Sequence, residues 1–391
     1  MELKNLEEKY FFHTYKRLPL EIEKGEGMYL VSKGGERYLD MFGGLAVNAL
    51  GYGNKRVTDA IKKQTDKYIH LSNYFLQKPQ IELGEMLVQD TGYKRIFFTN
   101  SGTESVEGAI KIARKWGEEN NKNKIISFTN SFHGRTFGAL SLMDKASYKV
   151  GFGPFLDNFE IVEYNNIDAI RKTAGTNTAA VILEFIQGEG GIQEASADFA
   201  YEIQTLQKKY GFLLIADEIQ SGVGRTGRFF GFQHFSLTPD IVVIAKPLGG
   251  GLPLGAILGG EKVENVLQPG MHGTTFGGNP VACAAGIAVL QEIKDKNLIE
   301  NSETVGKFFK TGLTELQNKY PDKIKDVRGK GMMLGMELTK SGDPAVASMR
   351  ERGILINCTN QNVLRFLPPL IAGKEDIDKC LSELDSVIDA I

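Results

Sequence analysis

A lysine at the end of an apolar segment is the first residue whose position suggests chemistry. Residues 241–245 are all apolar and rich in β-branched side chains, which predicts a buried strand of an α/β sheet. Lys246 follows directly, and the glycines and prolines of residues 247–255 disfavour a regular helix there. Loss of hydration lowers the pKa of such a lysine, and the neutral amine forms Schiff bases with carbonyl compounds. A lone lysine at a strand end is more often simply exposed to solvent. The rest of the sequence is therefore needed to distinguish a reactive lysine from an exposed one.

A carboxylate and a glutamine follow the preceding apolar segment, residues 212–216. A buried Asp217 needs a partner, and a protonated pyridine nitrogen would provide one while the ring acts as an electron sink. Ile219 would then lie on one face of the ring, and Gln220 would reach its hydroxyl group. Taken alone, a structural role for Asp217, as a helix cap or as one half of an ion pair with an arginine, is about as well supported as this cofactor contact.

Two hydroxyl- and glycine-rich turns are suited to a phosphate. Ser101 and Glu104 have the spacing of a helix capping box, and Gly102 between them lets backbone N–H groups approach a ligand. The turn at residues 273–279 contains further hydroxyl groups before a helix that begins with proline. Taken alone, the first motif is more often an ordinary capped helix than a phosphate site, and the second is also explained as a plain domain linker.

The loop at residues 131–136 contains an aromatic ring and a guanidinium group. Phe132 can stack on a planar ring, and Arg135 can bind a carboxylate through two parallel hydrogen bonds. Alone, this loop would be unremarkable at a protein surface. Together with the phosphate turn, Asp217 and Lys246, it completes the set of contacts that pyridoxal 5′-phosphate requires.

The elements that position these residues alternate between strand and helix. Strands are predicted at residues 95–99, 124–128, 179–185, 212–216 and 241–245, with intervening helices at 103–116 and 197–210. This alternation predicts a mostly parallel sheet covered by helices, with ligands bound beyond the carboxyl ends of its strands. Ser101, Phe132, Asp217 and Lys246 each come shortly after the end of such a strand.

The pattern changes after Asn279. Long amphipathic helices at 280–295 and 302–318 precede short strands at 333–338, 354–357 and 363–366 and a closing helix from residue 375. We therefore predict a large cofactor-binding domain at residues 51–278. A smaller α+β domain would combine residues 279–391 with residues 1–50.

Composition narrows the class of protein. With 391 residues, 42% of them hydrophobic, the chain is long enough for two globular domains. The 46 basic and 48 acidic residues leave no cationic excess for nucleic acid. Three cysteines without a CxxC motif and five histidines without ligand spacing disfavour a disulfide framework and a metal site.

No segment of the sequence resembles a signal peptide or a membrane span, so we expect a cytoplasmic protein with no membrane partner. The glycosylation sequon Asn357-Cys-Thr359 would then go unused. Residues 222–227 match G-x-G-x-x-G, but the motif does not directly follow its strand at 212–216 and no helical periodicity follows. A dinucleotide-binding module is therefore disfavoured.

The combined motifs resemble those of the class III (ω-amino-acid) aminotransferases over nearly the whole chain. They are residues 100–104, 132–136, 187–191, 217–227 and 273–279, together with Lys246 and its following glycines. Residues 43–51 and 364–369 are most similar to family members that act on N-acetylornithine.

The resemblance implies a fold-type I pyridoxal-phosphate enzyme, a homodimer with active sites at the subunit interface. Lys246 would bond to the cofactor and move the proton, Asp217 would bind the pyridinium nitrogen, and Gln220 the ring hydroxyl. The remaining cofactor contacts implied are Phe132 and Ile219 on the ring, Ser101, Gly102 and Thr103 at the phosphate, and Thr275 from the other subunit.

The resemblance also implies substrate contacts. Arg135 would bind the carboxylate of acetylornithine, with Thr274 near its acetyl end, and Arg365 would bind the α-carboxylate of glutamate or 2-oxoglutarate. Glu189 would cover Arg365 while the ω-amine substrate is bound. Tyr15 matches a tyrosine that ornithine aminotransferases use, although acetylornithine enzymes also have one there.

The predicted reaction moves the δ-amine of N2-acetyl-L-ornithine to 2-oxoglutarate, as in arginine biosynthesis. Free ornithine, succinylornithine and γ-aminobutyrate are the alternative donors, and an aminomutase on the same scaffold is less favoured. One departure from the family pattern is Phe185, where proline is usual. It leads us to expect a different path for the loop that carries Glu189.

Overall fold

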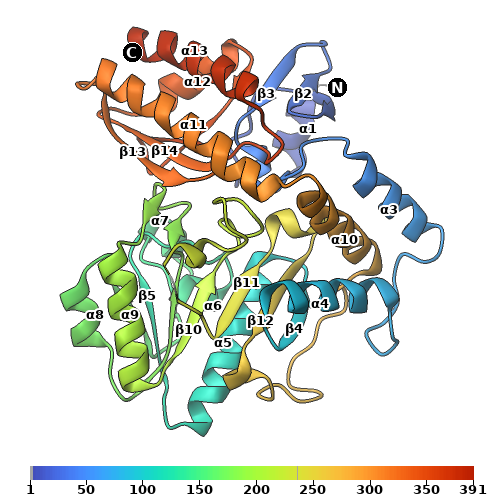
Figure 1. Ribbon diagram of the computed structural model, residues 1–391, viewed down its shortest axis with the longest axis vertical. Helices are drawn as coiled ribbons and strands as arrows, with labels where there is room; N and C mark the ends of the chain where they lie inside the picture. The colour runs from blue at the N-terminus through green and yellow to red at the C-terminus, as the bar shows by residue number, and fades with distance from the viewer. Residues whose placement is uncertain (1–2, 236) are drawn as a thin grey trace.

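A seven-stranded sheet forms the centre of the computed structural model, which describes residues 3–235 and 237–391 (Figure 1). Its strands are β4 (Arg95–Thr99), β5 (Lys124–Phe128), β6 (Phe159–Val162), β7 (Thr178–Leu183), β10 (Leu213–Asp217), β11 (Ile241–Ile244) and β12 (Gly255–Gly259). They lie in the order β4-β12-β11-β10-β7-β5-β6. Only β12 runs antiparallel to its neighbours, so the other strands all end at the same edge. The predicted mostly parallel sheet is confirmed.

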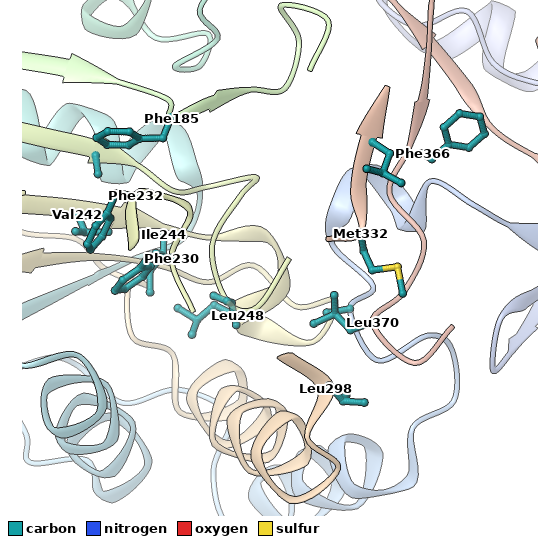
Figure 2. Packing of buried hydrophobic residues seen from close by; sticks show 14 of the residues in the cluster. Phe185, Phe230, Phe232, Val242, Ile244, Leu248, Leu298, Met332, Phe366 and Leu370 are labelled. Carbon is teal, nitrogen blue, oxygen red and sulfur yellow. The ribbon is translucent and has the colours of Figure 1, made fainter. Parts of the chain in front are cut away.

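Both faces of this sheet are covered because its strands are apolar on both sides. Ile241 and Val243 of β11 belong to a cluster with α5 (Gly102–Glu119) on one face. Val242 and Ile244 belong to a larger cluster on the other face. Figure 2 shows that cluster extending from β11 to Phe366 in the C-terminal part of the chain.

The C-terminal part forms a second, antiparallel sheet in the order β13-β14-β17-β16. Its strands are β13 (Ile324–Lys330), β14 (Met333–Leu338), β16 (Asn357–Thr359) and β17 (Val363–Phe366). The helices of this part are α10 (Pro280–Asp295), α11 (Leu298–Lys319), α12 (Asp343–Glu351) and α13 (Lys374–Ala390). The predicted helix at 302–318 therefore begins four residues earlier, at Leu298.

The N-terminal strands join a strand from the far end of the chain. The strands β1 (Ile22–Glu26), β2 (Tyr29–Ser32) and β3 (Arg37–Asp40) form a sheet with β15 (Ile354–Leu355), which pairs in parallel with β3. In Figure 1 the blue N-terminal strands and the red C-terminal helices accordingly lie together in the upper part of the molecule. The domain boundaries at residues 50 and 278 remain a prediction.

The remaining elements connect these sheets. They are α1 (Leu3–Tyr10), α2 (Gly43–Ala46), α3 (Lys55–Thr65), α4 (Lys78–Thr91), α6 (Phe137–Ser141), α7 (Ala146–Lys149), α8 (Ile167–Thr173), β8 (Ile186–Gln187), β9 (Gln193–Glu194), α9 (Ala197–Tyr210), and the 3₁₀ turns η1 (Gly231–Phe235), η2 (Lys246–Gly249) and η3 (Glu261–Val263). Across the described ranges, no helix is both long and apolar enough to cross a membrane.

Local chemistry explains where several elements begin and end. The helix α9 ends at Gly211, whose φ of 67° is easily reached without a side chain. The strand β12 was not predicted because glycines bound it on both sides. At Gly255 a Cβ atom would lie 2.5 Å from Thr99 Oγ1, so close packing against β4 requires this glycine.

Candidate active site

A cavity of about 450 Å³ lies at the edge where β4, β5, β10 and β11 end. Most of the residues predicted to bind a cofactor line it: Ser101, Gly102, Thr103, Phe132, Asp217, Ile219, Gln220 and Lys246, together with Arg135. The fold therefore brings together side chains from four segments that span about 145 positions of the sequence, as expected for the carboxyl edge of a parallel sheet.

Lys246 begins η2 directly after β11 and is partly buried. Its φ of 40° places it in the left-handed region, a strained conformation that clusters at functional sites. Burial lowers the pKa of its amine, although the nearby Glu189 carboxylate opposes this effect. The lowered pKa favours the neutral amine, which is the nucleophilic form.

Asp217 ends β10, and both of its carboxylate oxygens have partners. Oδ2 lies 2.7 Å from His133 Nδ1, and Oδ1 accepts a hydrogen bond of 3.1 Å from the Ile219 N–H. Burial lowers the pKa of His133, but Asp217 outweighs that effect and the net pKa is raised. The contact with His133 therefore gives the buried carboxyl group of Asp217 a polar partner inside the protein.

His133 is a site residue that the sequence interpretation missed, because histidines were considered only as metal ligands. Its Nε2 atom is buried and lacks a partner in the part of the chain that the structure describes. The available signal was its place beside Phe132, on the loop that follows β5. Such loops hold ligand contacts in parallel sheets.

Glu184 is a second buried carboxylate that was missed. Its Oε2 accepts a hydrogen bond of 2.9 Å from the Phe132 N–H, and its Oε1 accepts one of 3.0 Å from the Gly188 N–H. Burial, with the Asp217 charge adding to it, raises the pKa of Glu184 to about 7. Glu184 thus connects the loop that contains Phe132 with the loop that contains Glu189.

The N-terminus of α5 forms one end of the cavity. Ser101 Oγ accepts the Glu104 N–H, as its capping spacing predicted, but the Glu104 carboxylate binds the Asn100 N–H rather than closing a capping box. A Cβ atom on Gly102 would lie 2.8 Å from Ile219 Cδ1, so this position requires glycine. The first N–H groups of an 18-residue helix form a site for an anionic group.

Glu189 and Arg365 form an ion pair near Lys246. Arg365, on β17, is almost completely buried, and its Nη1 donates to Glu189 Oε1 at 2.6 Å. The same Nη1 donates to the Gly188 carbonyl and to Gln220 Oε1 at 3.2 and 3.3 Å. Burial raises the pKa of Glu189, but the charge of Arg365 outweighs this and the net pKa is lowered. Glu189 is therefore charged and covers Arg365.

Arg135 lies at the exposed rim of the cavity. Its guanidinium carbon is 3.7 Å from the centre of the Tyr148 ring and 5.6 Å from that of Phe132. Tyr148, on α7, was not predicted as part of the site. Stacking on aromatic rings holds a guanidinium group at the rim without neutralising its charge.

Comparison with known protein families identifies the family to which this chain belongs. The family model described as "Aminotransferase class-III" matches residues 10–388. The chain belongs to this family. The predicted family, the fold-type I architecture and the pyridoxal 5′-phosphate cofactor are thereby confirmed.

Individual relatives are similar to this chain over almost its whole length. Acetylornithine aminotransferase from Aquifex aeolicus is 46% identical over 97% of this chain and 100% of its own. The protein of that name from Methanocaldococcus jannaschii is 45% identical over 99% and 98%. Among solved structures, ornithine aminotransferase from Toxoplasma gondii is 31% identical with a TM-score of 0.95, covering 99% of this chain and 94% of the other. Acetylornithine aminotransferase from Elizabethkingia anophelis is 32% identical with a TM-score of 0.89, covering 99% and 98%.

Three predicted residues of this class III aminotransferase lie elsewhere in the subunit. Thr274 accepts a hydrogen bond of 3.2 Å from Asn100 Nδ2 but, like Thr275, lines a separate cavity of about 1330 Å³. Tyr15 is 73% exposed and stacks only with Arg17 among its described aromatic contacts. Within one subunit, the structure does not bring these three residues to Lys246.

The departure from the family pattern at Phe185 is compatible with the contact between Glu189 and Arg365. Phe185 is fully buried, with its ring centre 5.3 Å from that of Phe235 and 6.3 Å from that of Phe232. Glu189 still reaches Arg365, so the expected difference in the loop has no consequence for that ion pair.

The G-x-G-x-x-G segment of the aminotransferase has a structural role. It is followed by the 3₁₀ turn η1, not by an α-helix, so the context of a dinucleotide site is missing. The fully buried Arg225 within it donates to the carbonyl oxygens of Met332 and Pro368. The segment thereby ties the large sheet to the C-terminal part of the chain.

Proposed function

We propose that the enzyme moves the δ-amine of N2-acetyl-L-ornithine to 2-oxoglutarate, giving N-acetyl-L-glutamate 5-semialdehyde and L-glutamate, as a cytoplasmic step of arginine biosynthesis. The observation that carries this proposal is the Glu189–Arg365 pair beside Lys246. One substrate would react through its distal amine and the other through its α-amine. Arg365 must be free to bind the α-carboxylate of the second substrate, and it must be covered by Glu189 while the first substrate reacts. The name acetylornithine aminotransferase, shared by relatives of 40–46% identity, supports this donor.

The cavity fits pyridoxal 5′-phosphate in its chemistry. The N-terminus of α5, at Ser101, Gly102 and Thr103, would hold the phosphate, while Asp217 would bind the ring nitrogen. When bound, this cofactor supplies an electron sink that stabilises the charge left on a substrate carbon after its proton departs.

The protein's own groups would supply the protons and the orientation. Asp217, supported by His133, would keep a proton on the ring nitrogen. The Lys246 amine would take the proton from the substrate carbon and return it to the cofactor's C4′ atom. Phe132 and Ile219 would hold the ring from its two faces, and Gln220 would reach its hydroxyl group.

Substrate selection would depend on Arg135, which lines the cavity, and on the Glu189–Arg365 pair, which contacts the cavity residue Gln220. Arg135 would bind the carboxylate of acetylornithine while Glu189 covers Arg365. In the second half-reaction Glu189 would turn away, and Arg365 would bind the α-carboxylate of glutamate or 2-oxoglutarate. The two half-reactions require Arg365 in different states, covered by Glu189 in the first and uncovered in the second. The movement of the Glu189 side chain would therefore allow one site to serve both substrates.

Thr275, Thr274 and Tyr15 would act across a homodimer interface. This is supported by the exposed side chain of Tyr74, which is 97% exposed and lines the same cavity as Thr275. Thr275 would bind the phosphate held by the other subunit. Sedimentation should show a dimer, and Thr275→Ala should weaken cofactor binding without loss of that dimer; a monomer with full activity would contradict this part.

The proposal as a whole is tested with purified protein and a panel of amine donors. The holoenzyme should be yellow, and Lys246→Ala should lose the absorbance of the Lys-bound cofactor. Acetylornithine should give the highest kcat/KM with 2-oxoglutarate; a higher value for ornithine, succinylornithine or γ-aminobutyrate would reassign the donor. Product formation without any 2-oxo acid would instead identify an aminomutase.

A further inference from the structure

Two side chains of β16 contact the two members of the Glu189–Arg365 pair, one each. Asn357 Oδ1 accepts a hydrogen bond of 3.1 Å from Arg365 Nε. The Thr359 hydroxyl donates one of 2.8 Å to the backbone carbonyl of Glu189. Residues two apart on a strand face the same side, and Cys358 between them faces the other. The strand therefore presents one contact to the cation and one to the carboxylate residue.

The contact to Arg365 does not depend on Glu189. Asn357 lies directly opposite Arg365 in the pairing of β16 with β17, and it binds Nε, whereas Glu189 binds Nη1. When Glu189 turns away, the Nε contact persists and keeps the plane of the guanidinium group in place. A fixed plane is what two parallel hydrogen bonds to a carboxylate require.

The contact to Glu189 holds its backbone while leaving its side chain free to turn. The side chain of Glu189 is 26% exposed, in contrast to 2% for that of Arg365. The preceding residue is also fixed, because the Gly188 N–H binds Glu184 and the Gly188 carbonyl binds Arg365. Glu189 can thus rotate about its side-chain bonds from a stationary backbone and return to the same covered position.

We propose that Asn357 and Thr359 are positioning residues that set the discrimination between the two classes of substrate. Asn357 keeps the guanidinium group of Arg365 in place to bind the α-carboxylate of glutamate when Glu189 has turned away. Thr359 keeps the backbone of Glu189 in place so that its side chain covers Arg365 while the ω-amine substrate reacts. The inference rests on the proposed function, because it assigns each residue to one of the two half-reactions. It also gives the Asn357-Cys-Thr359 tripeptide a role other than glycosylation.

The test measures each half-reaction separately in the holoenzyme, by stopped-flow absorbance of the cofactor. Asn357→Ala should lower kcat/KM for L-glutamate about tenfold, the effect of losing one hydrogen bond to a charged group, with a smaller change for acetylornithine. Thr359→Val, which keeps the shape and removes the hydroxyl, should lower kcat/KM for acetylornithine more than that for glutamate. Thr359→Ser should restore it. Cys358→Ala is the matched control from the opposite face and should change neither value.

A binding measurement supplies a second readout. Glutarate, a dicarboxylate that cannot react, should bind about tenfold more weakly to Asn357→Ala holoenzyme by calorimetry. The strand β16 lies at the edge of its sheet, so substitutions of Asn357 should leave the hydrophobic core intact. Asn357→Ser is a second variant for use if Asn357→Ala does not fold. Equal losses in both half-reactions, or failure of Thr359→Ser to recover, would overturn the inference. Wild-type enzyme that uses neither acetylornithine nor glutamate would instead overturn the proposed function.

Discussion

Replacing Glu189 with alanine removes the carboxylate that covers the Arg365 guanidinium. The pair is joined by a hydrogen bond of 2.6 Å, and the Arg365 side chain is 2% exposed. Arg365 keeps its contacts to the Gly188 carbonyl, Gln220 and Asn357, so the cation should stay in place after the substitution. The expected change is therefore one of access to Arg365, not of its position.

The magnitude follows from the contact that is lost. A hydrogen bond to a charged group contributes about 1.5–3 kcal/mol, which corresponds to roughly 10- to 150-fold in a rate or binding constant. In Glu189→Ala the α-carboxylate of glutamate no longer has to displace Glu189. Acetylornithine, in contrast, gains a competing mode in which its carboxylate binds Arg365 and its δ-amine is misplaced. The ratio of the two kcat/KM values should shift toward glutamate by that factor.

The assay follows the two half-reactions of the holoenzyme by stopped-flow absorbance, with L-glutamate and acetylornithine as separate donors. Glu189→Gln is the matched variant, because it keeps the size and one acceptor oxygen but loses the charge. It should give a shift of intermediate size. Equal losses in both half-reactions would refute the reasoning and remove Glu189 from this role.

Two further predictions concern buried groups around the cavity. Glu218 is 1% exposed, and burial raises its pKa from 4.5 to about 7. A raised carboxyl pKa gives stability that is fully present below pH 4.5 and lost as the pH rises toward 7, amounting to ~3 kcal/mol. Urea unfolding of cofactor-free protein should thus show a flatter pH dependence for Glu218→Gln than for wild type, and parallel curves would contradict this. Gly102→Ala should push a methyl group against Ile219. Overpacking of this kind costs about 1–3 kcal/mol, so pyridoxal 5′-phosphate should bind about tenfold more weakly in reconstitution titrations. An unchanged affinity would show that Ile219 moves aside without cost.

Much of the architecture could be predicted from local sequence. The strands β4, β5, β14 and β17 and the helices α9 and α10 begin and end at the residues that their apolar patterns, caps and glycines indicated. These features act within a few residues of the backbone, so they can be recognised without a fold. The strand β12 escaped prediction because glycines bound it, and the one at Gly255 is explained by close packing against β4, a contact with a distant segment.

The grouping of Lys246, Asp217, Phe132 and the turn at Ser101–Thr103 could also be predicted from the sequence, because all of them follow strands whose ends meet at one edge of a parallel sheet. The groups that contact and support these residues could be identified only from the fold. His133 reaches Asp217 across 84 positions, and Glu189 reaches Arg365 across 176. Such pairings, and the pKa shifts that burial causes, arise when distant segments exclude water together, and no local pattern specifies which segments will meet.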